Sequence, residues 1–360
     1  MSQKVYKTLG KFQRETISEG HADVFLVTGK NSFYQSGAYE MIPHAKKFYD
    51  FSSNPKIEDV IKGIEIFNSI SPSPELIVAI GGGSVIDMAK LIKGLCQEKN
   101  PEKSIKENRL GNIADRRMIA IPTTAGSGSE STPFAVVYLN GKKYSLQHEK
   151  LLPDEIVLDY TLTKSMSPRL TAVTGMDALS QAIEAYWSIN SNGESKQYSR
   201  DAMDLILSNL ETAVNHPTNE SRKGMLLGAN LAGKAIAIAK TTACHSISYP
   251  ITSNFGIPHG HAVALTLGEI LEYNSQLDKD CNDSRGSDYV KKTISELPVT
   301  KDLIHDLMKD IGLETRLSDL GIDKKDIGLI VKEGFNPQRM KNNPREITRD
   351  DLRKILEEIY

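Results

Sequence analysis

A buried strand that runs directly into a glycine turn and a helix is the feature that most constrains the fold. The segment LIVAIGGGSVIDMAK covers residues 76–90, and its apolar residues are continuous instead of alternating with polar ones. Two further apolar runs, at 24–29 and 118–124, have the same character, and a helical pattern lies between them at 56–70. Strands that are buried on both faces and separated by helices are typical of a parallel sheet. The first part of the chain is therefore predicted to be an α/β domain.

After about residue 165 the pattern changes, because strand signals nearly vanish. Apolar residues recur at helical spacing in four segments, which are predicted as helices: 174–188, 199–214, 224–240 and 350–360. A chain of 360 residues exceeds one ordinary hydrophobic core. We therefore predict two domains, an α/β dinucleotide-binding domain over residues 1–163 and an all-helical domain over residues 164–360.

Charge and cysteine content narrow the class of protein. The net charge is −2 and the charges are interspersed, so a nucleic-acid or membrane-surface partner is not indicated. No apolar run approaches the roughly 20 residues of a membrane-spanning helix. The N-terminal segment is polar, and the three cysteines are scattered without a disulfide framework. We expect a cytoplasmic protein with a small-molecule substrate.

Two loops rich in glycine and small polar residues follow predicted strands. The first contains Gly81, Gly82 and Gly83, and the second is IPTTAGSGSE at 121–130. Glycine lets a backbone approach phosphates, and the N-terminus of the following helix favours an anion. The first loop matches neither the GxGxxG nor the GxxxxGK[ST] pattern, which argues against a kinase or ATPase. A tight turn without a ligand is an alternative for the first loop alone, but the two loops together favour a nucleotide site at the sheet edge.

A second constellation lies in the predicted helical domain. Asp177 and Gln181 are four residues apart, as are His245 and Tyr249, so each pair shares one helix face. His259 follows a loop punctuated by glycine and proline. A carboxylate, an amide oxygen and two imidazoles are competent ligands of a divalent metal. Residue type alone leaves open the alternative of an exposed aspartate and ordinary core histidines.

Four motifs in this order resemble those of the iron-containing (group III) alcohol dehydrogenase family: GGGSVIDMAK, IPTTAGSGSE, GMDALSQAIEAY and GIPHGHA. The resemblance implies the dehydroquinate synthase-like fold of that family, with a nucleotide-binding domain followed by a helical one. It also implies hydride transfer between a nicotinamide and an alcohol or aldehyde, beside a divalent metal in the interdomain cleft. The metal is expected to be Fe²⁺ or Zn²⁺, and the family's ligand positions fall on Asp177, Gln181, His245 and His259.

Two positions depart from the family pattern. Gln181 stands where the family usually has a histidine, so its amide oxygen would bind the metal more weakly than an imidazole would. Tyr249 stands where the family usually has a second histidine near the nicotinamide. A proton would then reach the product through Tyr249, His261 or water.

The resemblance also assigns cofactor contacts to residues in and beyond the two loops. The pyrophosphate is expected at the first loop, and the nicotinamide ribose and ring are expected near Asp87 and the Thr123–Thr124 pair. A further cofactor contact is expected at Lys143. The full set of expected cofactor residues is Gly82, Gly83, Ser84, Asp87, Thr123, Thr124, Ser127 and Lys143. Members that prefer NAD(H) tend to carry an acid after the strand at 24–29. This chain has Gly29, Lys30 and Asn31 there, so we predict that NADP(H) is favoured over NAD(H), with Lys30 beside the 2′-phosphate.

The substrate is predicted from a narrower resemblance. The segments 127–159 and 239–250 are most similar to the branch that reduces phosphonoacetaldehyde to 2-hydroxyethylphosphonate. A phosphonate needs cationic partners, and the candidates are Lys240, Arg339 and Arg345. Phe134 is a further candidate substrate residue. The three cations are alternatively ordinary surface charges. An unbranched alcohol, a diol or a sugar-acid alcohol stays open as the substrate.

Two rival functions remain at this stage. A dehydroquinate-synthase-like lyase shares the expected fold, and Gln181 could mark a metal-poor relic with a binding role. The ordered motifs favour the dehydrogenase. Family members are commonly dimers with the N-terminal strand at the interface, so we also expect a homodimer, although the sequence gives no direct sign of it.

Overall fold

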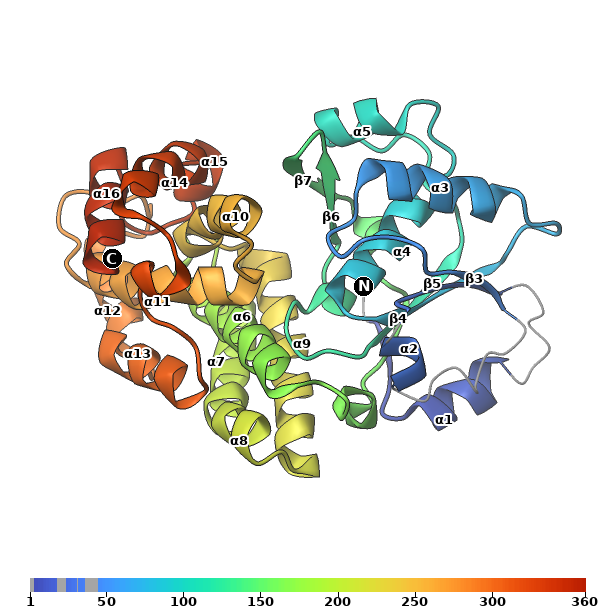
Figure 1. The fold of residues 1–360 in the computed structure, drawn as a ribbon, viewed down its shortest axis with the longest axis horizontal. Helices are drawn as coiled ribbons and strands as arrows, with labels where there is room; N and C mark the ends of the chain where they lie inside the picture. Colours follow the sequence, from blue (N-terminus) through green and yellow to red (C-terminus); the bar gives the residue numbers. More distant parts are fainter. Residues whose placement is uncertain (1–2, 18–23, 31, 36–44) are drawn as a thin grey trace. The chain divides into compact units, whose positions relative to one another are not determined.

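The chain divides into two compact units, Met1–Met166 and Ser167–Tyr360 (Figure 1). The computed structural model describes residues 3–17, 24–30, 32–35 and 45–360. The division lies three residues after the predicted boundary. It coincides with a helix start, because the Ser167 side chain accepts a hydrogen bond from the Leu170 backbone N–H and Pro168 occupies the first helical turn.

The first unit contains a six-stranded sheet in which every neighbouring pair is parallel. The strand order is β1-β8-β5-β4-β2-β3. The strands are β1 (Lys4–Tyr6), β2 (Val24–Thr28), β3 (Lys46–Phe48), β4 (Leu76–Gly81), β5 (Arg117–Pro122) and β8 (Glu155–Val157). The helices of this unit are α1 (Leu9–Phe12), α2 (Ser32–Gln35), α3 (Ile57–Asn68), α4 (Gly83–Leu95) and α5 (Pro101–Glu107). The predicted parallel α/β architecture is confirmed.

Apolar residues fill both faces of this sheet, because successive side chains of a strand point in opposite directions. In β4, Ile77 and Ala79 belong to a cluster with α3 and α4. The intervening Val78 and Ile80 belong to a second cluster with α1 and α2. Helices therefore cover both faces (Figure 1), which explains why the strands read as continuous apolar runs in the sequence.

An antiparallel hairpin lies outside the main sheet and was not predicted. Its strands are β6 (Phe134–Leu139) and β7 (Lys142–Gln147). The two residues between them, Asn140 and Gly141, both have positive φ (51° and 74°), as a tight two-residue hairpin turn requires. Lys143 therefore stands within a strand, opposite Tyr138.

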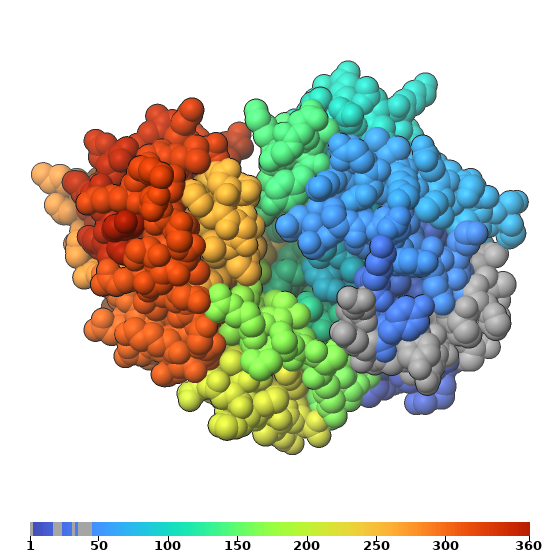
Figure 2. Space-filling view, viewed as in Figure 1, coloured from blue at the N-terminus to red at the C-terminus, as the bar shows by residue number. Residues whose placement is uncertain are grey.

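The second unit is helical, as predicted. Its helices are α6 (Pro168–Trp187), α7 (Gly193–Leu207), α8 (Leu210–Asn215), α9 (Asn219–Ala239), α10 (Ala243–Phe255), α11 (His259–Ser275), α12 (Ser287–Ser295), α13 (Lys301–Asp310), α14 (Ile327–Gly334), α15 (Pro337–Met340) and α16 (Arg349–Glu358). Helix α6 packs against α7, α9 and α11. In Figure 2 the later part of this unit, in orange, lies directly beside its earlier part, in green and yellow. Of the described helices, none has the length and apolar character needed to cross a lipid bilayer.

One helix predicted over residues 199–214 is wrong in extent, because the structure has two helices there. Helix α7 ends at Leu207 and α8 begins at Leu210. The Asn209 side-chain amide donates to the Leu205 carbonyl over 2.7 Å, which satisfies a carbonyl of the last turn of α7. Asparagine at the junction therefore ends one helix before the next begins.

Candidate active site

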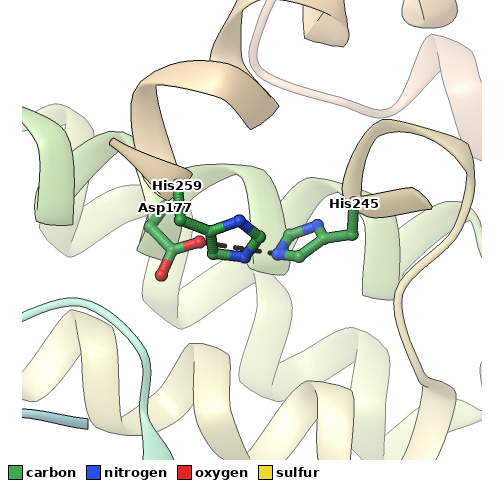
Figure 3. A group of neighbouring side chains, drawn as sticks. All are labelled: Asp177, His245 and His259. Atoms are coloured by element: carbon green, nitrogen blue, oxygen red, sulfur yellow. Dashed lines mark ion pairs between the residues drawn. The ribbon is translucent and has the colours of Figure 1, made fainter. Parts of the chain in front are cut away.

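Three predicted metal ligands converge in the helical unit (Figure 3). Asp177 comes from α6, His245 from α10 and His259 from the first turn of α11. Each offers one ligand atom, and these three atoms lie within 4.8 Å of one another. Asp177 Oδ1 is 3.5 Å from His245 Nε2. The spacing suits one cation held by all three side chains.

A glycine brings the third ligand close to the first. A Cβ atom on Gly260, in the first turn of α11, would lie 2.8 Å from the Asp177 Cβ and would also overlap the Val173 carbonyl. Only glycine allows α11 to approach α6 this closely. His259, the preceding residue, is thereby placed beside Asp177.

Hydrogen bonds fix the orientation of both imidazoles. The Ser248 hydroxyl donates to the His245 carbonyl over 2.8 Å, so it accepts from His259 Nδ1 at 3.2 Å. The Nδ1 atom of His245 contacts the Glu184 carboxylate. Each ring thus places its proton on Nδ1 and leaves Nε2 to bind a metal.

Gln181 belongs to the same cluster. Its amide nitrogen donates to Asp177 Oδ2 over 3.3 Å, as expected for a pair four residues apart on α6. Its Oε1 atom and His245 Nε2 are buried and have no hydrogen-bond partner among the described residues. Buried polar atoms without partners are costly, and a divalent cation would satisfy both. The residues present therefore fit the metal that the family pattern implies.

The charges in this cluster favour a cation. Burial by itself would lower the pKa of His245, but the negative charges of Glu184 and Asp177 raise that pKa to about 9. Two carboxylates in a buried site thus attract positive charge, which a proton or a metal ion can supply.

Tyr249 lies next to the metal cluster, and Arg339 lies over its ring. The Tyr249 ring stacks on the His259 ring with centroids 5.8 Å apart and an interplanar angle of 14°. The Arg339 guanidinium lies 4.9 Å from the centroid of the Tyr249 ring and donates to Thr241 Oγ1 over 3.4 Å. Burial raises the pKa of Tyr249, and Arg339 partly offsets that effect. Tyr249 is thus positioned beside the proposed ligands, as predicted from its place in α10.

Lys240 ends α9 in a backbone conformation with φ 65°. Burial, and to a smaller extent repulsion by Arg339, lower the pKa of Lys240 to about 8. Lys240 and Arg339 therefore form a basic pair, and mutual repulsion makes this pair a favourable place for an anion.

Two other candidates of the sequence analysis are occupied elsewhere in the unit. His261 is completely buried, and its Nε2 donates to the Glu314 carbonyl over 2.7 Å while its Nδ1 accepts from Arg169. Arg345 bonds to Asp280 and to the Tyr273 carbonyl, both over 2.6 Å. These hydrogen bonds favour a structural role for both side chains, and a proton relay through His261 or a substrate contact of Arg345 stays a prediction.

In the first unit, the two predicted cofactor loops pack against each other at the carboxyl ends of adjacent strands. Gly81 at the end of β4 pairs with Pro122 at the end of β5. A Cβ atom on Gly82 would lie 3.1 Å from Thr124 Oγ1, and one on Gly83 would lie 2.9 Å from the Ser127 Cβ. Glycine at both positions therefore permits the close approach of the loops. Helix α4 begins at Gly83, and its N-terminus is a suitable anion site.

The neighbouring polar side chains brace these loops. Asp87 accepts from the Ser129 hydroxyl over 2.5 Å and from the Val136 N–H over 3.0 Å. Ser84 Oγ accepts from the Asn54 N–H over 3.2 Å. The hydroxyl of Thr123 is buried without a hydrogen-bond partner among the described residues.

Lys90 was not anticipated. It is completely buried and donates to the carbonyls of Ser129, Thr132 and Phe134 over 2.6–2.8 Å. Phe134, a candidate substrate residue, is thus tied by its backbone to α4. Asp87 and Lys90 are three residues apart and so share one face of α4. Both bond to Ser129 in the second loop, and this spacing was the sequence signal that could have identified Lys90.

A pocket of about 220 Å³ lies at the end of β2, where discrimination between the two nicotinamide cofactors was predicted. It is lined by Thr28, Gly29, Lys30, Phe33, Tyr34, Lys47 and Tyr49. Lys30 forms an ion pair with Asp50 at 3.0 Å, whereas Lys47 lies over the Phe33 ring at 5.6 Å. Lys47 is a second cation that the sequence did not single out. Asn31 lies outside the described residues.

Comparison with known proteins agrees with this arrangement. The model of iron-containing alcohol dehydrogenases matches residues 6–160, and the model of the C-terminal part of the Fe-containing alcohol dehydrogenase family matches residues 171–360. Phosphonoacetaldehyde reductase of Streptomyces viridochromogenes is 33% identical over 79% of this chain and 76% of its own length. The NADPH-dependent butanol dehydrogenase of Clostridium saccharobutylicum is 32% identical over 85% of this chain and 81% of its own length.

Among solved structures, sulfoacetaldehyde reductase from Bifidobacterium kashiwanohense in complex with NAD⁺ superposes with a TM-score of 0.86. It is 31% identical, and the match covers 99% of this chain and 96% of that one. Both halves of the sequence and the whole fold thus point to one family, and the dehydrogenase interpretation is favoured over the lyase. The chain belongs to the iron-containing alcohol dehydrogenases, a family of NAD(P)-dependent enzymes that interconvert alcohols and aldehydes.

Proposed function

We propose that this enzyme reduces a small aldehyde that carries a phosphonate or sulfonate group, with phosphonoacetaldehyde as the leading candidate and 2-hydroxyethylphosphonate as its product. The observation that carries the proposal is the basic pair of Lys240 and Arg339, since Arg339 covers the Tyr249 ring, which stacks on His259. Relatives named for phosphonoacetaldehyde and for sulfoacetaldehyde reduction support the same chemical class. Both substrates join an aldehyde to a tetrahedral oxyanion through one carbon.

The proposed metal ligands are Asp177, Gln181, His245 and His259. When bound, Fe²⁺ or Zn²⁺ would withdraw electron density from the substrate oxygen and so ease hydride addition to the carbonyl carbon. Asp177 neutralises part of the charge in the site. The amide oxygen of Gln181 is a neutral ligand, which predicts weaker binding than a third imidazole would give.

The chain's own residues have three further roles in the proposed reaction. Tyr249 holds a proton for the product oxygen, and the stacked His259 ring fixes the plane of its phenol. Lys240 and Arg339 bind the anionic end of the substrate and thereby orient its carbonyl. A guanidinium fork suits a tetrahedral oxyanion.

For the cofactor, we propose NADP(H) in preference to NAD(H), bound in the first unit. The backbone at Gly82 and Gly83 and the N-terminus of α4 would receive the pyrophosphate. Lys30 and Lys47 line the pocket beside Gly29 and would face a 2′-phosphate, although Asp50 already pairs with Lys30. Lys143, Asp87, Thr123 and Ser127 stay candidate cofactor contacts.

We place the enzyme in the cytoplasm because its three cysteines, Cys96, Cys244 and Cys281, are all free thiols. A homodimer remains our expectation.

A panel of aldehydes with NADPH and added Zn²⁺ or Fe²⁺ tests the substrate. Phosphonoacetaldehyde should exceed propanal in kcat/KM by about 100-fold, because charge-assisted hydrogen bonds contribute about 1.5–3 kcal/mol each. The Arg339→Ala variant should lose most of that advantage. Lys341→Ala is the matched control, since it removes one charge from the exposed end of the same segment and should leave the preference intact.

Equal turnover of propanal and the phosphonate by the unchanged enzyme would remove the anionic substrate class. The family activity would stand in that case, with an unbranched alcohol, a diol or a sugar-acid alcohol as the next candidates for the panel.

A further inference from the structure

Glu184 is a buried carboxylate that the proposed ligand set does not include. It lies in α6 with its side chain completely buried. With Asp177 and Gln181 it forms an i, i+4, i+7 series on one helix face. A buried carboxylate is costly unless every lone pair finds a partner, so its contacts reveal its role.

One oxygen of Glu184 caps helix α10. Oε1 accepts hydrogen bonds from the backbone N–H groups of Thr242 (3.1 Å) and Cys244 (2.9 Å). Thr242 occupies the N-cap position, yet its side chain makes no capping bond of its own. Its hydroxyl instead donates to the same Oε1 over 2.8 Å. A carboxylate from α6 thus replaces the usual capping side chain and meets the positive end of the helix dipole.

The other oxygen of Glu184 contacts the imidazole of His245. Oε2 lies against Nδ1 of His245, while Nε2 of the same ring faces Asp177 Oδ1 at 3.5 Å. The Thr242 hydroxyl that donates to Oε1 accepts in turn from Trp187 Nε1 over 2.9 Å. The carboxylate is therefore held on both sides and cannot rotate away from the ring.

From these contacts we propose that Glu184 is a positioning residue for the metal site. Its carboxylate receives the Nδ1 proton of His245 and the start of α10 together, and so presents His245 Nε2 to the divalent cation. The inference rests on the proposed metal ligands. Partners of this kind fix the ring orientation and tautomer of a metal-binding histidine.

The Glu184→Gln variant keeps the size and shape of the side chain, so it can separate the capping of α10 from the hydrogen bond to His245. An amide offers one acceptor and one donor, whereas Glu184 accepts on both sides. If the amide oxygen caps α10, the NH₂ group faces Nδ1 and drives the imidazole proton to Nε2, where it competes with the metal. The affinity for Zn²⁺, measured by competition with a chelator, should fall about 10–100-fold.

The matched control is Glu269→Gln. Glu269 is also a buried helical carboxylate of this unit, but it lies 3.4 Å from Lys301 and 3.4 Å from His305 instead of a proposed ligand. This variant should unfold more easily than the unchanged protein while its Zn²⁺ affinity stays within about twofold. A general loss of stability would affect both variants alike, so the contrast isolates positioning.

A measurement on the unchanged protein completes the test. In the Zn²⁺-loaded enzyme, NMR should show a His245 Nδ1–H resonance that exchanges slowly with water. That resonance should be absent from the His245→Ala variant, which assigns it.

Lack of this Nδ1–H resonance in the Zn²⁺-loaded enzyme, or equal Zn²⁺ affinity in Glu184→Gln and the unchanged protein, would overturn the role of Glu184 alone. A failure of the unchanged protein to bind Zn²⁺ would instead remove the metal site and this inference together.

Discussion

At the scale of single residues, the lowered pKa of Lys240 gives the substrate proposal a pH signature. Burial and Arg339 place that pKa near 8. A protonated lysine binds an anion and a neutral one does not, so kcat/KM for sulfoacetaldehyde should fall about tenfold as pH rises from about 7 to about 9. A sulfonate keeps its charge over this range, so the fall reports the enzyme and not the substrate.

The Lys240→Arg variant is the control for this profile. Arginine stays charged throughout, so the loss on the alkaline side should disappear. Propanal carries no anion, and its profile should lack the same step. A step that persists in Lys240→Arg would assign the titration to a different group.

Residue types and the i, i+4 spacing made Asp177 and His245 candidate ligands, but the family resemblance was needed to select them together with His259. The structure brings those three together. Ser248 and Gly260 could not be identified in this way, since their roles depend on contacts between helices. Glu184 could have been found, because it continues the series begun by Asp177 and Gln181 along α6. His261 and Arg345 show the limit of residue type, because their hydrogen bonds to Glu314, Asp280 and Tyr273 could not be predicted from the sequence.

At the scale of elements, the loop that follows β2 decides the cofactor prediction. NADPH should give a higher kcat/KM than NADH. The Gly29→Asp variant should shift the ratio of the two kcat/KM values toward NADH by at least about tenfold, because a carboxylate repels the 2′-phosphate and accepts hydrogen bonds from the ribose hydroxyls. The opposite change, Asp50→Asn, releases Lys30 from its ion pair and should strengthen the preference for NADPH. A tenfold preference of the unchanged enzyme for NADH would contradict the assignment.

The elements that the sequence predicted well were the ones with long, uniform patterns. β2, β5 and α3 lie within two residues of their predicted limits. The β6–β7 hairpin was missed because both strands are only partly buried and β7 carries two lysines, although Asn140 and Gly141 are a strong turn signal. The break between α7 and α8 was missed because Asn209 acts through one side-chain hydrogen bond that periodicity does not register.

At the scale of the whole molecule, the predicted homodimer can be tested at the edge of the main sheet. β1 is the last strand in the sheet order and pairs with β8 of its own chain. Among the described strands nothing pairs with its other edge, and Val5 on it is 47% exposed. An exposed edge is a natural site for pairing with a second copy.

Light scattering at micromolar concentration should therefore give twice the mass of the chain. Val5→Lys adds a charge to the exposed edge and should shift the equilibrium toward the monomer. Leu329→Lys, at a residue of the helical unit that is 38% exposed, should leave the mass unchanged. A monomeric mass for the unchanged protein would disprove the dimer.

The placement of the ligands on three separate helices has a consequence for how the enzyme acquires its metal in the cell. Asp177, His245 and His259 meet only after α6, α10 and α11 have assembled, and Glu184 joins α6 to α10 by contacts that need no ion. We therefore expect metal loading at these proposed ligands to follow synthesis and folding, and the bound ion to depend on which divalent metal the host supplies. Preparations from iron-rich and zinc-rich cultures would then differ in activity with the same polypeptide, so specific activities are comparable only when expressed per bound metal.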